Sequence, residues 1–211
     1  MTEATTTARR TPAEVWQEMV RGNRRFVDGS PQHPRQDVER RELLAAEQAP
    51  HVTLFGCSDS RLAAEIIFDK GLGDLFVVRN AGHVITDSVI ASLEYPVALL
   101  DVPLIVVLSH DSCGAVRAAI DIDDPDAAPL PPHIAGLVAG IRPAVRAADS
   151  RSAEDVGRAH LQRTVSDLVA RSELISDAIA EGRLAVVGAN YKLHEGVVVP
   201  VVAIGDIGVT I

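Results

Sequence analysis

Four short apolar runs stand out along the chain. They cover residues 51–56, 74–79, 103–109 and 184–190, and each is rich in aliphatic or aromatic side chains. Strands buried on both faces have this continuous apolar character, whereas a half-exposed strand alternates apolar and polar residues. The pattern therefore predicts four buried strands, and the apolar residues at 196–204 predict a last one.

Helical patterns separate these runs and predict helices at residues 62–69, 86–101, 113–121, 133–149 and 153–181. Pro96 falls inside the second of them and predicts a kink, because proline removes a hydrogen bond from the helix interior. The segment 121–132 is rich in Asp and Pro, which favours an exposed loop. Strands that alternate with helices are typical of an α/β fold, in which a central, mostly parallel β-sheet is flanked by helices.

The first helix is predicted from its start signal. Thr11 is a suitable N-cap, Pro12 fits the first helical position and Glu14 completes a capping box. The apolar residues that follow, Trp16 among them, share one face of a helix that ends near Gly29. This face can pack on a partner subunit, in the manner of an arm, or on its own domain.

A connector and a second helix follow. Residues 30–36 contain Pro and Gln, and Asp37 can cap a helix that runs to Gln48. We therefore expect an N-terminal helical arm with its connector, residues 1–36, and an α/β domain, residues 37–211, within a single domain overall.

Composition limits the class of protein. The chain has 211 residues, 47% of them hydrophobic and only 3% aromatic, so one domain with an aliphatic core is expected. The formal net charge is −9 and no basic cluster is present, which disfavours nucleic acid and anionic membranes as partners. No apolar run reaches the ~20 residues of a membrane span. The polar residues 1–10 lack the apolar core of a signal peptide, and we expect a cytoplasmic protein with reduced thiols.

Both cysteines of the chain follow predicted strands. Cys57 comes directly after the run 51–56, and Cys113 comes three positions after His110, at the end of the run 103–109. Ligands bind at the carboxyl ends of parallel strands, so the fold brings two thiolates and one imidazole together. These groups are preferred ligands of Zn²⁺ and leave one of its four positions open, where water is activated. The sequence predicts a zinc hydro-lyase or hydrolase.

Two charged residues accompany the first cysteine. The guanidinium of Arg61 can hold the carboxylate of Asp59 with two hydrogen bonds and keep it ionised. Beside a metal, that carboxylate can accept a hydrogen bond from a bound water, or it can move to the open position and close the site. An ordinary surface ion pair is the alternative, and the nearness of Cys57 disfavours it.

At this point the motifs match a known family. Cys-Ser-Asp-Ser-Arg at 57–61, followed by His-x-x-Cys-Gly at 110–114, resembles the β-class carbonic anhydrases. Phe-Val-Val-Arg-Asn-Ala-Gly at 76–82 and Glu-Tyr at 94–95 extend the resemblance, which spans most of residues 12–205. It implies a carbonate dehydratase, which hydrates carbon dioxide reversibly to bicarbonate and a proton. It also implies that residues 37–211 are a zinc-binding catalytic domain.

The resemblance implies a role for each residue of the site. The zinc ligands are Cys57, His110 and Cys113, joined by Asp59 only in a closed state, and Asp59 and Arg61 are the catalytic pair. The expected substrate-binding residues are Gln48, Phe76, Ala81, Tyr95 and Gly114. In the family the pocket lies at a dimer interface and dimers often pair, so a homodimer or homotetramer is expected.

Other functions fit part of the pattern. The same zinc site can hydrolyse carbonyl sulfide or carbon disulfide, and the shape of the pocket decides between these gases. A non-catalytic zinc-binding or sensor protein needs only the three ligands, so the pair of Asp59 and Arg61 disfavours it. A thiol redox protein is disfavoured because the cysteines do not form a Cys-x-x-Cys motif.

The histidines other than His110 have no local motif. His83 follows the second predicted strand and is either a structural, hydrogen-bonded histidine or a proton relay. No role is assigned to His33, His51, His133, His160 and His194.

Overall fold

A computed structural model describes residues 10–122, 124 and 126–211, so the polar segment 1–9 and two positions of the predicted loop lie outside the described residues. Within them, five strands form one sheet in the order β2-β1-β3-β4-β5. The strands are β1 (Val52–Cys57), β2 (Leu75–Asn80), β3 (Leu104–His110), β4 (Ala185–Tyr191) and β5 (Val198–Ile204). The first four are parallel and β5 is antiparallel to β4, which confirms the predicted mostly parallel α/β sheet.

The strands lie close to their predicted positions. Each of β1 to β4 begins and ends one residue later than predicted. Every residue of β1 and β3 is buried, because both strands are interior to the sheet and helices cover both faces. The prediction of complete burial is wrong for β2. This strand forms an edge of the sheet, and its Val77 and Arg79 are exposed.

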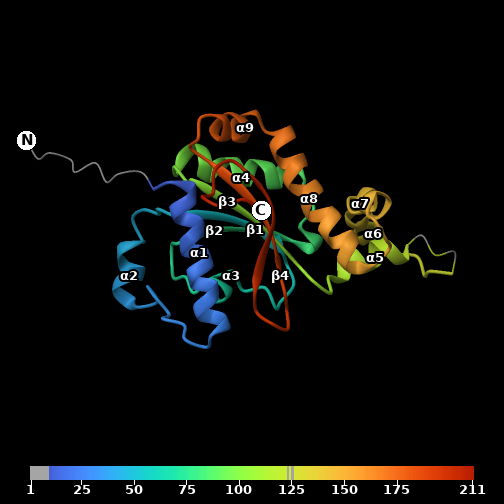
Figure 1. The fold of residues 1–211 in the computed structure, drawn as a ribbon, viewed down its shortest axis with the longest axis horizontal. Helices are drawn as coiled ribbons and strands as arrows, with labels where there is room; N and C mark the ends of the chain where they lie inside the picture. The colour runs from blue at the N-terminus through green and yellow to red at the C-terminus, as the bar shows by residue number, and fades with distance from the viewer. Residues whose placement is uncertain (1–9, 123, 125) are drawn as a thin grey trace, which may run out of the picture.

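Helices cover both faces of the sheet (Figure 1). They are α1 (Pro12–Val27), α2 (Val38–Leu43), α3 (Ala64–Ile67), α4 (Asp87–Leu99), α5 (Gly114–Asp121), α6 (Pro132–Ala139), α7 (Arg142–Ala147), α8 (Ala153–Arg171) and α9 (Glu173–Ala180), with a short 3-10 turn, η1 (Ala81–His83). Apolar side chains of α1, α3 and α5 to α7 form one core with one face of the sheet. Those of α4, α8 and α9 form a second core with the other face.

Several predicted helices differ from the observed ones. The stretch 133–149 consists of α6 and α7, and the stretch 153–181 consists of α8 and α9. The break before α9 lies at Ser172, whose hydroxyl accepts a hydrogen bond from the Ile175 N–H and thereby caps the new helix. Helix α2 is capped by Asp37 as predicted but ends before Gln48. No helix in the described part of the chain is both long and apolar enough to span a membrane.

Helix α1 packs on its own domain. Its capping box forms as predicted, with the Thr11 hydroxyl accepting from the Glu14 N–H and the Glu14 carboxylate accepting from the Thr11 N–H. Trp16 and Met19 are buried in the core beside β1 and β3. The Asn23 side chain donates to the carbonyls of Ile67 and Gly196 and accepts from the Val198 N–H. These contacts fix α1 across the loop that leads to β5.

Candidate metal centre

The three predicted metal ligands meet at the carboxyl end of the sheet. Cys57 is the last residue of β1 and His110 is the last residue of the neighbouring β3, while Cys113 immediately precedes α5. One ligand atom from each residue lies within 4.8 Å of the other two, and all three residues are buried. Parallel pairing therefore brings together groups that are far apart in the sequence, as the spacing predicts.

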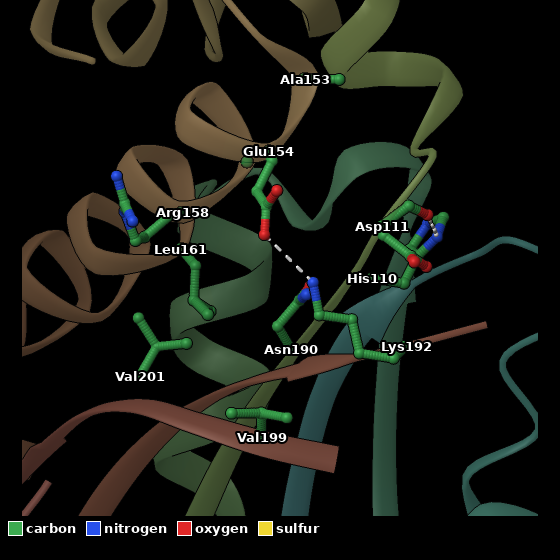
Figure 2. A pocket seen from close by; sticks show the side chains of 11 residues that line it. His110, Asp111, Ala153, Glu154, Arg158, Leu161, Asn190, Lys192, Val199 and Val201 are labelled. Carbon is green, nitrogen blue, oxygen red and sulfur yellow. Dashed lines mark hydrogen bonds and ion pairs between the residues drawn. The ribbon is translucent and has the colours of Figure 1, made fainter. Parts of the chain in front are cut away.

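The orientation of His110 suits a metal ligand. Its Nδ1 lies 2.8 Å from the backbone carbonyl of Asp111, and the two are drawn side by side in Figure 2. Because a carbonyl oxygen only accepts, Nδ1 carries the proton in the neutral ring and Nε2 keeps its lone pair. Nε2 is buried and has no hydrogen-bond partner among the described residues. An unpartnered acceptor beside two thiols fits a metal ion, and the mixed sulfur and nitrogen donors suit zinc.

The two thiols differ in their electrostatic surroundings. The Cys57 sulfur accepts a hydrogen bond of 3.3 Å from the Gly82 N–H. The neighbouring Cys113 thiol and the Gly82 N–H lower the pKa of Cys57. The same contact with Cys57, together with burial, raises the pKa of Cys113, because a second negative charge beside the first is unfavourable. The two thiols therefore resist being ionised together, and binding of a cation favours loss of their protons.

Asp59 is ionised beside the metal ligands. Its carboxylate accepts hydrogen bonds from Arg61 Nε at 2.9 Å and Nη2 at 2.7 Å, and from the Arg61 backbone N–H at 3.0 Å. The Arg61 guanidinium holds the pKa of this carboxyl well below its usual range. The Oδ2 atom lies 3.8 Å from His110 Nε2. The carboxylate thus adjoins the ligands while its oxygens are engaged by Arg61.

Residues of β2 fix the loop that carries Cys57 and Asp59, and the sequence analysis gave them no role. Arg79 donates from Nε to the carbonyl of Cys57 at 3.0 Å and from Nη2 to the carbonyl of Asp59 at 2.6 Å. The Asn80 side chain donates to the carbonyl of Val84 and accepts from its N–H, both at 2.8 Å, and so closes the η1 turn. Both residues belong to the motif at 76–82 that carries the family resemblance, but the motif does not show that Arg79 reaches carbonyls on another segment.

The predicted substrate-binding residues are only partly grouped. Gln48, Phe76 and Tyr95 line one open hollow at the β2 edge of the sheet, and the rings of Phe76 and Tyr95 stack with centroids 6.0 Å apart. Ala81 instead begins η1 and Gly114 begins α5, and both are exposed. A side chain built at Gly114 would meet nothing within 4 Å, so no close backbone approach among the described residues requires glycine there.

A second hollow lies beside His110, between α8 and strands β4 and β5 (Figure 2). Leu161, Val199 and Val201 supply apolar side chains, and an ion pair of 3.2 Å joins Lys192 to Glu154 at its rim. None of the predicted substrate-binding residues lines it. The sequence did not predict this hollow, because it depends on how α8 lies against the sheet.

Comparisons with known proteins agree with this geometry. A family model for carbonic anhydrase matches residues 52–198. Carbonic anhydrase 2 of Mycobacterium tuberculosis is 48% identical over 200 residues, covering 93% of this chain and 96% of that protein. A carbonic anhydrase of Mycolicibacterium smegmatis is 45% identical over 200 residues, covering 93% of this chain and 97% of that protein.

Solved structures show the same architecture. The β-carbonic anhydrase of Coccomyxa, in complex with acetazolamide, is similar with a TM-score of 0.69 and 25% identity, over 88% of this chain and 86% of that one. A tetrameric β-carbonic anhydrase of the ascomycete Sordaria macrospora has a TM-score of 0.68 and 23% identity, over 76% of this chain and 84% of that one.

Proposed function

This chain belongs to the β-class carbonic anhydrase family, and we propose that Cys57, His110 and Cys113 hold its catalytic zinc ion. The chain is a carbonate dehydratase, which interconverts carbon dioxide with bicarbonate and a proton. The observation that supports the ligand assignment is the buried cluster of two thiols and one imidazole nitrogen within 4.8 Å of one another. The free lone pair of His110 Nε2 completes that set.

Zinc bound there would lower the pKa of a water molecule, so that its deprotonated form is available near neutral pH. The chain itself prepares the donors. Cys57 and Cys113 bind as thiolates, the Gly82 N–H stabilises the Cys57 sulfur, and the Asp111 carbonyl orients His110.

Asp59 acts as an acceptor of fixed direction. Arg61 keeps it ionised and holds both of its oxygens, so that it can accept a hydrogen bond from the attacking water and orient that water toward carbon dioxide. If Arg61 released it, the carboxylate could move to the metal and exclude water. In the described geometry the carboxylate is bound to Arg61, which supports its proposed role as an acceptor.

The substrate pocket is proposed to form from Gln48, Phe76, Ala81, Tyr95 and Gly114. Stacked rings at Phe76 and Tyr95 offer an apolar surface for an apolar gas. Tyr95 is nevertheless 46% exposed and Leu99, on the same helix, is 67% exposed. The two residues are one helical turn apart, and exposed apolar side chains that lie together mark an interaction surface. We propose that a second copy of the chain covers them in a homodimer, which can pair further into a homotetramer.

The two free thiols indicate the cellular compartment of the protein. Cys57 and Cys113 are both free in the described structure, and a disulfide between them would remove two of the three ligands. A reducing compartment prevents that reaction, so we propose a cytoplasmic location.

The deciding experiment combines zinc analysis with stopped-flow hydration of carbon dioxide. We expect one zinc ion per chain and rapid hydration, with hydration lost in Asp59→Ala while zinc is retained. Asp149→Ala, at an 88% exposed side chain, is the matched control and should keep full activity. Zinc bound without hydration in the unmodified protein would instead indicate a binding or sensor protein. Parallel assays with carbonyl sulfide and carbon disulfide test the sulfur analogues.

A further inference from the structure

A histidine on α8 is connected to the metal ligands through one residue, Gly82. The Nε2 of His160 lies 2.7 Å from the carbonyl oxygen of Gly82, and the N–H of Gly82 donates to the sulfur of Cys57 at 3.3 Å. Both hydrogen bonds are buried, and they join segments 78 and 25 residues apart. His160 thus holds the carbonyl of the residue whose N–H reaches the Cys57 sulfur.

This contact determines which nitrogen of His160 carries the proton. Burial lowers its pKa, so the ring is neutral near pH 7 and carries a single N–H. Since the Gly82 carbonyl can only accept, that proton must lie on Nε2. Nδ1 is buried without a hydrogen-bond partner in the described part of the chain. His160 therefore acts as a donor with one fixed direction.

The Gly82 peptide is confined on its other sides. Gly82 has a φ of +72°, and a side-chain carbon there would lie 2.8 Å from the Cβ of Ala115 and 2.9 Å from the Cδ1 of Ile141. The Asn80 side chain closes the turn around it through Val84. Glycine is thus required by both conformation and space, and the carbonyl faces α8 while the N–H faces Cys57.

We propose that His160 is a positioning residue of the metal centre, which holds the Gly82 carbonyl so that the opposite N–H of this turn is aimed at the Cys57 sulfur. The inference rests on the proposed zinc site. The carbonyl and the N–H of Gly82 lie on either side of its Cα, so a donor that fixes the carbonyl restricts rotation at this residue and with it the direction of the N–H. An N–H directed at a thiolate stabilises its negative charge. Groups that orient metal ligands in this way commonly change metal affinity by about 10- to 100-fold when they are removed.

The neighbouring imidazole does not share this role. His83 lies with its ring centroid 4.5 Å from that of His160 and is fully buried. Neither of its nitrogens has a hydrogen-bond partner within the described residues. Its contacts with His160 and Phe55 are packing contacts, so His83 serves the core that supports His160.

The test compares two substitutions of the same residue. His160→Leu removes the donor, whereas His160→Gln places an amide N–H near the position of Nε2. Thr164→Val is the matched control, since Thr164 is buried on the same helix and donates only to the His160 carbonyl. Zinc affinity is measured by competition with a chromophoric chelator, and the thiolate-to-metal charge-transfer band is recorded after replacement of zinc by cobalt(II).

We expect His160→Leu to weaken zinc binding by about 10- to 100-fold and to move the charge-transfer band to longer wavelength, because a sulfur without its donor is more easily oxidised. His160→Gln should restore both properties, and Thr164→Val should leave both unchanged. An unchanged band and affinity in His160→Leu, or equal effects of His160→Leu and Thr164→Val, would overturn the inference.

Two further outcomes are separable. If the unmodified protein binds no zinc, the proposed function fails; if it binds zinc and the His160 variants behave alike, only this inference fails. Should His160→Leu not fold, the ¹⁵N spectrum of the histidines in the unmodified protein decides. An Nε2-protonated His160 with a slowly exchanging proton is expected, and the Nδ1 tautomer would contradict the proposal because Nε2 could not then donate.

Discussion

Arg61 holds the carboxylate of Asp59 by two parallel hydrogen bonds, of 2.9 Å from Nε and 2.7 Å from Nη2. Oδ2, one of the two bonded oxygens, lies 3.8 Å from His110 Nε2, so the same pairing that keeps the carboxylate ionised also sets its distance from the metal ligands. The ion pair is partly exposed and adds little to the stability of the fold, so its importance is that it orients the Asp59 carboxylate.

Replacing Arg61 should therefore impair catalysis more than folding. We expect Arg61→Ala to lower kcat/KM for carbon dioxide hydration by about 100-fold, because an unheld carboxylate is misdirected or binds the metal itself. Arg61→Lys keeps the positive charge but lacks the planar guanidinium, so its kcat/KM should lie between those of Arg61→Ala and the unmodified enzyme. Stopped-flow assays at matched zinc content measure this, with the melting temperature as the control. Activity of Arg61→Ala within twofold of the unmodified enzyme would refute the role.

The strands and the ligand cluster could be predicted because both depend on local pattern. Continuous apolar runs located β1 to β4 to within one residue. Cys57 and His110 directly follow such runs, and adjacent parallel strands bring their ends together. For these four strands, the prediction was wrong only in the burial of β2, because a sequence does not reveal which strand forms the edge of the sheet.

The supporting residues could not be predicted, because each acts through a distant partner. His160 contacts a carbonyl 78 residues away, and Arg79 contacts carbonyls 22 and 20 residues away. Backbone carbonyls have no sequence signature, so the motif that contains Arg79 does not reveal its partners, and no motif marks His160. The same reason explains why Gly82 was noted only as part of a family motif, although its φ and its N–H make it part of the site.

The unequal thiols predict the proton balance of metal binding. Since the pKa of Cys57 is lowered and that of Cys113 is raised, we expect the metal-free pair to hold one proton near neutral pH. Binding of cadmium, whose bound water stays protonated, should then release about one proton from the thiols rather than two. Calorimetry at pH 7 in two buffers of different ionisation enthalpy measures the number of protons released per bound cadmium ion. A release of two protons would show that both thiols are protonated in the absence of metal.

Asp69 is predicted to be important for stability. Its side chain is 1% exposed and accepts hydrogen bonds from Arg25 Nε and from the backbone N–H groups of Gln32 and His33. Asp69→Asn leaves Arg25 without its buried partner and should lower the free energy of unfolding by about 3 kcal/mol at pH 7. The substitution weakens the contacts of α1 and the connector with the loop between α3 and β2. Urea unfolding measures the resulting loss of stability.

The pH dependence of that loss has a definite sign. Burial opposes ionisation of Asp69, but the hydrogen bonds from Gln32, Arg25 and His33 outweigh it and lower the pKa. A carboxyl with a lowered folded-state pKa stabilises the fold above its unfolded pKa of about 3.9, and this contribution is lost as the pH falls through the folded-state value. The difference between Asp69→Asn and the unmodified protein should therefore shrink below about pH 3.9. The control is Asp167→Asn, because the Asp167 side chain is 39% exposed and pairs with Arg163 on the surface. It should change neither the free energy of unfolding at pH 7 nor its dependence on pH.

Arg79 should control the placement of both Cys57 and Asp59, since its two donors hold the carbonyls of these residues. Arg79→Met keeps the apolar stem but frees the loop, and we expect kcat/KM to fall between about 10- and 100-fold, because small displacements of reacting groups are costly. Arg79→Lys can satisfy only one carbonyl at a time and should recover part of the loss. Arg117→Met is the control, because that side chain is 67% exposed and pairs only within α5. Full activity in Arg79→Lys would mean that the charge matters and the paired hydrogen bonds do not, whereas full activity in Arg79→Met would remove Arg79 from the site altogether.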